Sequence, residues 1–111
     1  MKSSLAILYT TIDSQENAEN LARLAISSKV ATCVNIISNG KSIYLYNNQI
    51  AENNEIYLIF KTSTLIIEQL EKFILEQHSY DLPAIIKFYP ESSMEFLSYI
   101  EANLKNNQLN S

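Results

Sequence analysis

The sequence predicts an α+β fold in which helices pack on an antiparallel sheet. Short β-prone runs alternate with segments whose apolar residues recur at helical spacing, and only one glycine and two prolines interrupt 111 residues. A content of 47% hydrophobic and 18% charged residues suits one globular domain with a substantial core. We expect a single domain over residues 1–105 and a polar tail over 106–111.

The first half of the chain predicts a strand, a helix and three further strands. Residues 5–9 are β-prone, and Asp13 with Glu16 three residues later is typical of a helix start. The apolar face of this helix comprises Ala18, Leu21, Ala22, Ala25 and Ile26. Strands are then predicted at 30–37, 41–46 and 55–62, with a turn at Asn47-Asn48, because asparagine tolerates left-handed geometry.

The second half predicts two helices separated by a strand. Ser63 or Thr64 can cap a helix that ends near Gln77, since Pro83 and the residue before it disfavour helical geometry. The apolar face of this helix comprises Ile66, Leu70, Phe73 and Ile74. A strand follows at 84–89.

A capping box at Ser92 and Glu95 opens the last helix, and Asn106-Asn107 end it. Its apolar side comprises Phe96, Leu97, Ile100 and Leu104. The resulting order is the ferredoxin-like split βαβ pattern with a hairpin extension and a C-terminal helix.

Two predicted strands are apolar at nearly every position, namely residues 56–60 and 85–89. In a sheet with one face in water, apolar and polar residues should alternate along each strand instead. If Ile56, Leu58 and Phe60 face the helices, the opposite face presents Tyr57 and Ile59. We therefore expect other subunits to cover that face; the alternative is that the tyrosines lie flat on a wet sheet.

Composition excludes several functions. A net charge of -4 and a single arginine, Arg23, argue against nucleic-acid binding. No apolar run approaches the length of a membrane span, and one cysteine cannot form an internal disulfide, so we expect a cytoplasmic protein. No catalytic triad, phosphate-binding loop or paired-carboxylate motif is present, which predicts that the chain is not an enzyme.

Residues 78–83 are the segment in which a functional site is most expected, because the reactive side chains of His78, Tyr80 and Asp81 lie close together there in the sequence. His78 is either a metal ligand or a residue that ends the helix. Cys33 is the other soft ligand, although a buried cysteine is more often a small hydrophobe. Two ligands are too few for a closed site, so either Asp81 or a neighbouring subunit contributes, or the site is a surface site with adventitious affinity.

Three further side chains are candidates for a ligand-binding cleft. Lys61 can neutralise Glu55 or Asp81, bind an anion, or extend its amine to water. Tyr80 and Tyr46 can line the same cleft, and packing in an oligomer interface is the alternative.

Five blocks of the sequence form a pattern that a known family shares. They are 31–36 (Ala-Thr-Cys-Val-Asn-Ile), 42–46 (Ser-Ile-Tyr-Leu-Tyr), 55–62 from Glu55 to Lys61-Thr62, and 78–83 (His-Ser-Tyr-Asp-Leu-Pro), with 21–23 (Leu-Ala-Arg) in the first helix. In their order and spacing these blocks resemble those of the CutA family, the divalent-cation tolerance proteins. The resemblance implies a ferredoxin-like homotrimer associated with copper and other divalent cations. We expect that no cofactor is required and that copper or another divalent cation can bind, with His78, Cys33 and Asp81 as the metal candidates. One alternative is a PII-like signalling or scaffold trimer that binds a small ligand or partner near Lys61, Tyr80 and Tyr46. The other is a structural trimer whose metal contacts are incidental.

The chain departs from the family pattern in the same blocks. Tyr46 stands where the family usually has tryptophan, and Ser79 and Asp81 replace proline and glutamate. Ala84 removes a carboxylate that could bind a cation or pair with Lys61. We expect weakened binding of hard or borderline cations in consequence.

Overall fold

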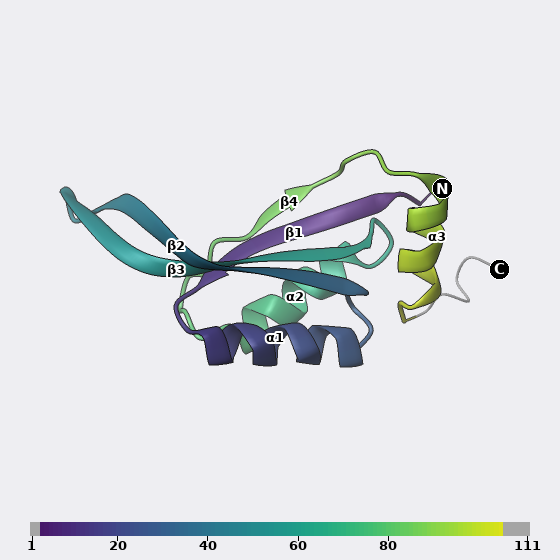
Figure 1. Ribbon diagram of the computed structural model, residues 1–111, viewed down its shortest axis with the longest axis horizontal. Coiled ribbons are helices and arrows are strands. Elements are labelled where there is room, and N and C mark those ends of the chain that lie inside the picture. Colours follow the sequence, from purple (N-terminus) through teal and green to yellow (C-terminus); the bar gives the residue numbers. More distant parts are fainter. Residues whose placement is uncertain (1–2, 106–111) are drawn as a thin grey trace.

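A four-stranded antiparallel sheet carries α1 and α2 on one face, and α3 lies at one end of the sheet (Figure 1). This computed structural model describes residues 3–105. The elements are β1 Leu5–Ile12, α1 Gln15–Ser27, β2 Cys33–Tyr46, β3 Gln49–Ser63, α2 Ile67–Gln77, β4 Ile86–Phe88 and α3 Met94–Ala102. The sheet order β2-β3-β1-β4 confirms the predicted ferredoxin-like split βαβ arrangement.

The start of α1 differs from the prediction by one residue. Ser14, not Asp13, is the N-cap, and its Oγ accepts a hydrogen bond from the Asn17 backbone N–H at 3.1 Å. Serine is as good a cap as aspartate, and the extended backbone at Ser14 decides between them. Asp13 is thereby left exposed in the β1–α1 connection.

The two strands predicted at 30–37 and 41–46 are one strand, β2, with a bulge. Ile37 pairs with Tyr57 and Gly40 pairs with Glu55, so two residues of β2 lie opposite one residue of β3. Asn39 adopts φ 65 in this bulge. The turn at Asn47-Asn48 is confirmed, because both residues have positive φ, as a two-residue hairpin turn requires.

The predicted side-chain cap of α2 is wrong. The N-cap is Ile66, which makes no side-chain capping bond, while the Ser63 hydroxyl accepts from the Leu65 N–H and donates to Glu101. The helix ends at Gln77 as expected, with His78 as C-cap. Strand β4 is shorter than predicted and is tied to α2 by Lys87, whose Nζ lies 2.6 Å from a Glu71 carboxylate oxygen.

Helix α3 is also capped one residue later than predicted, by Ser93, whose Oγ accepts from the Phe96 N–H. Ile100 is fully buried, and its carbonyl accepts a hydrogen bond from Thr32 Oγ1 at 2.6 Å. The helix ends at Ala102. The predicted stop at Asn106-Asn107 and the polar tail lie outside the described residues.

The two faces of the sheet have different environments. On the helix-covered face, Leu8, Leu58 and Phe60 are completely buried and form the centre of the core. On the other face, cross-strand rows are formed by Cys33, Lys61, Ile7 and Phe88, and by Asn35, Ile59, Tyr9 and Ile86. This open face is only half-buried, and it presents Tyr57 and Ile59 as predicted.

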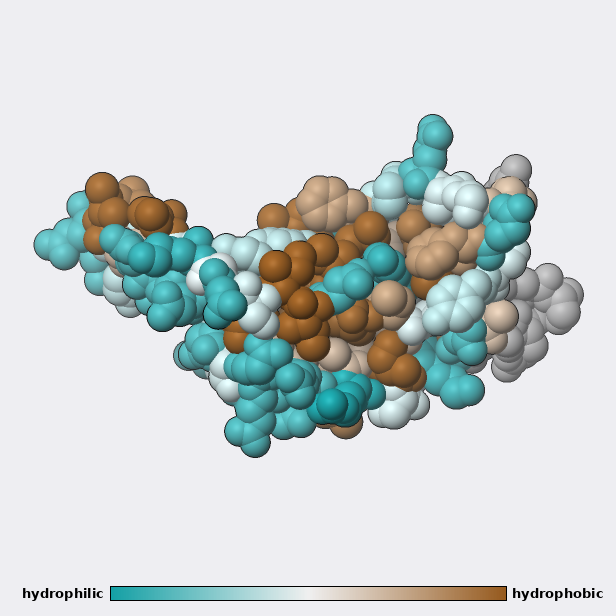
Figure 2. Space-filling model, viewed as in Figure 1, coloured by the Kyte–Doolittle hydropathy of each residue, from teal (hydrophilic) through white to brown (hydrophobic). Residues whose placement is uncertain are grey.

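The distal halves of β2 and β3 extend beyond the helices as a two-stranded hairpin (Figure 1), which gives the molecule extents of 51 × 25 × 22 Å. Its apolar side chains remain in solvent: Leu45 is 71% exposed and Ile50 is 80% exposed. Figure 2 shows hydrophobic side chains gathered over the sheet and again at the end of the hairpin. No helix within residues 3–105 is long and apolar enough to cross a membrane.

Candidate functional site

His78 ties the loop after α2 to strand β1. Its Nε2 lies 2.8 Å from the Thr11 carbonyl oxygen, which can only accept, so Nε2 carries the proton. Its Nδ1 then accepts a hydrogen bond from the Tyr80 backbone N–H at 3.0 Å. The imidazole is 9% exposed and both ring nitrogens are engaged. The ring therefore holds residues 78–80 in place.

Tyr80 extends from this loop to Glu55 on β3. Its hydroxyl donates to Glu55 Oε2 at 2.9 Å, and its ring lies 4.8 Å from the His78 ring. Burial, with the hydrogen bond and negative charge of Glu55, raises the pKa of the Tyr80 phenol well above its usual range. Tyr80 is therefore a neutral hydrogen-bond donor that positions a carboxylate.

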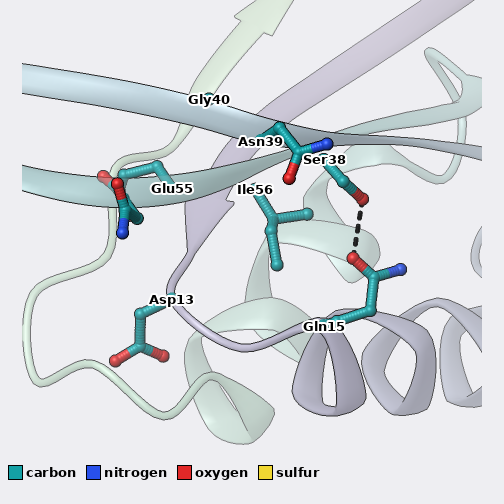
Figure 3. Close-up of a pocket in the computed structure, with 8 residues that line it drawn as sticks. Asp13, Gln15, Ser38, Asn39, Gly40, Glu55 and Ile56 are labelled. Atoms are coloured by element: carbon teal, nitrogen blue, oxygen red, sulfur yellow. Dashed lines mark hydrogen bonds between the residues drawn. The ribbon is translucent and has the colours of Figure 1, made fainter.

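A pocket of about 370 Å³ opens beside Glu55 (Figure 3). Its walls come from the β1–α1 connection with Asp13, from the β2 bulge with Asn39, and from Asn54 and Glu55 of β3. The bulge is joined to α1 by a hydrogen bond of 2.6 Å from Ser38 Oγ to Gln15 Oε1. The pocket is thus lined by carboxylates and amides.

Cys33 and Lys61 lie far from this pocket, near the opposite end of the sheet. Cys33 carries a half-buried free thiol. In the register of the sheet it lies opposite Lys61 of β3, which lies opposite Ile7 of β1. Thr11, the partner of His78, is four residues further along β1, or about 13 Å away along the strand. Cys33 and His78 therefore cannot bind the same ion within one subunit.

The remaining predicted residues are also dispersed. The Lys61 Nζ lies 5.6 Å from the centre of the Phe96 ring, and none of the ion pairs within residues 3–105 joins it to Glu55 or Asp81. Tyr46 is exposed at the hairpin turn, and Asp81 is exposed in the loop after α2. The described part of the chain contains no group of three or more metal-ligating side chains.

Glu55 is the pocket residue that sequence reasoning considered only as a partner of Lys61. It directly precedes the apolar run 56–60, and a carboxylate at that place is typical of a strand end that is exposed to solvent. In the structure it is only 9% exposed, because Tyr80 covers it from the loop. Pattern alone does not reveal this contact, which joins residues 25 positions apart.

Comparison with known proteins agrees with this architecture. The family model described as CutA1 divalent ion tolerance protein matches residues 6–103. A divalent-cation tolerance protein CutA of Thermus thermophilus is 29% identical over 98 residues, covering 87% of this chain and 95% of the relative. A chloroplastic CutA of Arabidopsis thaliana is 28% identical and covers 90% of this chain and 56% of the relative.

Solved structures give the same result. The crystal structure of CutA1 from Ehrlichia chaffeensis superposes with a TM-score of 0.87 at 29% identity, covering 92% of this chain and 96% of that one. The family match spans nearly the whole folded region, and the sheet order and helices agree with it. This chain therefore belongs to the CutA1 divalent ion tolerance family.

Proposed function

We propose that this chain acts as a homotrimeric divalent-cation tolerance protein that binds metal ions, copper foremost, and that it is not an enzyme. The observation that carries the proposal is family membership over residues 6–103. A cytoplasmic location stays a prediction, supported by the single cysteine; a relative in Arabidopsis thaliana is named chloroplastic.

Exposed apolar surface supports the proposed homotrimer. Phe88 is 50% exposed and Ile86 48% exposed on the open face of the sheet, and the hairpin presents Leu45 and Ile50. Exposed apolar patches of this kind are typical of association sites. Packing of these surfaces between copies would remove them from water.

Metal binding is proposed with ligands drawn from more than one subunit. Within one subunit the three candidate ligands are poorly placed to bind one metal ion, since Cys33 and His78 are held apart by the sheet and Asp81 is exposed in a loop. Cys33 lies on the open face, so trimer formation can bring it close to another copy. A metal bound at His78 Nδ1 would replace the hydrogen bond from the Tyr80 N–H, worth about 1 kcal/mol, which is a loss of roughly fivefold in metal affinity, while the Nε2–H can keep its bond to the Thr11 carbonyl.

A Cu(II) titration in competition with a chelator tests metal binding. We expect selective binding of about one ion per subunit or fewer, weakened in Cys33→Ser, in His78→Ala and in Asp81→Asn. Weak binding that is the same in all variants would contradict a defined site. Light scattering tests assembly separately, and a mass of 12.7 kDa at micromolar concentration would contradict the homotrimer.

A ligand-binding trimer of the PII-like kind remains the second candidate. The pocket beside Tyr80 favours it, whereas Lys61 and Tyr46 lie away from that pocket within one subunit. A ligand cleft containing all three would need residues from neighbouring copies. Loss of ligand-induced stabilisation in Lys61→Ala, at unchanged metal affinity, would support this candidate.

A further inference from the structure

The distal parts of β2 and β3, residues 41–54, form an arm that projects beyond the helices (Figure 1). Leu45 and Ile50 lie opposite each other near its turn and remain exposed. Among residues 3–105, no side-chain hydrogen bond or ion pair joins residues 42–53 to a residue outside the arm. The direction of the arm relative to the sheet is therefore fixed at its base, where β2 contains the bulge.

Tyr57 contacts the arm at this base. It lies on β3 opposite Ile37, on the side of the bulge that faces away from the arm. Its hydroxyl accepts a hydrogen bond from the Lys41 backbone N–H at 3.1 Å and donates one to the Lys41 carbonyl oxygen at 3.2 Å. One side chain thus engages both polar groups of the first arm residue, and these bonds connect the two sides of the bulge.

Gly40 makes room for this contact. A Cβ at position 40 would overlap the ring and hydroxyl atoms of Tyr57, so the ring packs directly against the glycine. Gly40 does not have a positive φ, and the left-handed residue of the bulge is Asn39. The only glycine of the chain is therefore required by the close approach of Tyr57 and not by the backbone conformation. The fitted glycine and the doubly bonded hydroxyl are separate observations that place the ring at this point.

We propose that Tyr57 is a positioning residue that holds the arm in one direction relative to the sheet. Ser38 and Asn39 have no partner in the strand ladder, so the bulge would act as a hinge without this contact. The inference rests on the proposed homotrimer, in which the apolar side chains of the arm pack between copies. An arm of fixed direction loses less conformational entropy on association, so the bonds between Tyr57 and Lys41 favour assembly.

Amide hydrogen exchange and backbone order parameters of the full, metal-free chain test the holding contact. Tyr57→Phe keeps the ring and removes the hydroxyl. We expect the Lys41 amide to exchange about fivefold faster in this variant, because it loses one hydrogen bond. The order parameters of residues 42–53 should fall, while the amides of β1 should keep their exchange rates.

Two further variants sharpen this test. Tyr44→Phe is the matched control, because it removes a hydroxyl bonded to Asn53 inside the arm and leaves the base intact. It should exchange at Lys41 like the original protein. Gly40→Ala displaces the Tyr57 ring but keeps its hydroxyl, and it should raise the Lys41 exchange rate as Tyr57→Phe does.

Light scattering during dilution, at a fixed concentration of urea, tests the effect on association. Tyr57→Phe should dissociate at a several-fold higher protomer concentration than the original protein, because its arm must be ordered when copies assemble.

Two results would overturn the inference. The first is equal Lys41 exchange and equal arm order parameters in Tyr57→Phe and the original protein. The second is a more mobile arm in Tyr57→Phe with unchanged assembly. An original protein that is monomeric at every concentration contradicts the homotrimer and the role in assembly with it, whereas the Lys41 exchange still decides whether Tyr57 holds the arm.

Discussion

Replacement of His78 by alanine tests whether the imidazole holds the loop after α2 against β1. The substitution removes the bonds to the Thr11 carbonyl and the Tyr80 N–H, each worth about 1 kcal/mol net. It also removes the ring contact with Tyr80 at 4.8 Å, worth roughly 0.5–1.5 kcal/mol. We expect the free energy of unfolding to fall by about 3 kcal/mol.

Urea unfolding followed by circular dichroism measures this loss. Protomer concentration must be fixed and a chelator present, because assembly and bound metal both change apparent stability. His78→Gln, which can keep one of the two bonds, should lose about half as much. Gln77→Ala, an exposed neighbour at the same helix end, serves as the control and should stay within about 0.5 kcal/mol. Equal losses in His78→Ala and Gln77→Ala would refute the structural role of the ring.

Three other substitutions give separate tests. Gly40→Ala should destabilise the hairpin base by about 1–3 kcal/mol, because the new Cβ would overlap the Tyr57 ring, and Tyr57→Ala in the same chain should recover part of that loss in urea unfolding. In the folded chain the pKa of Tyr80 is raised above 10.0, so the tyrosine of the unfolded chain ionises first as pH rises. The stability that depends on the neutral phenol is therefore lost above pH 10.0, and Tyr80→Phe should lose less stability than the original protein as alkaline buffer is made more basic. An unchanged slope of the free energy of unfolding against pH would contradict this. Ala84→Glu should strengthen Cu(II) or Zn²⁺ binding in a chelator competition, and unchanged affinity would show that the missing carboxylate is not what weakens the site.

Local patterns predicted the elements well where one residue type or one period decides the structure. The Asn47-Asn48 turn follows from the tolerance of asparagine for positive φ. The prediction that α2 ends near Gln77 is confirmed: Pro83 disfavours helical geometry at the residue before it, and the extended backbone of His78 ends the helix. The unalternating strand 56–60 correctly indicated an open apolar face containing Tyr57 and Ile59.

The predictions failed where neighbouring residues have similar propensities. Ser93 caps α3 in place of Ser92, and two serines side by side differ only in backbone conformation. The bulge before Gly40 was read as a break between two strands, because a single extra residue in a ladder leaves little local signal.

The sequence by itself determined the family, the order of helices and strands, and the two-faced sheet, because these depend on residue type and on periods within a few turns. Tertiary structure alone decided what the candidate residues can do. It placed Cys33 in register with Ile7 and His78 against Thr11, positions about 13 Å apart along β1, engaged both imidazole nitrogens, and buried Glu55 beneath Tyr80. Those relations arise from contacts between segments distant in the chain, and such contacts are fixed only when the whole sheet, its register and its helices pack together.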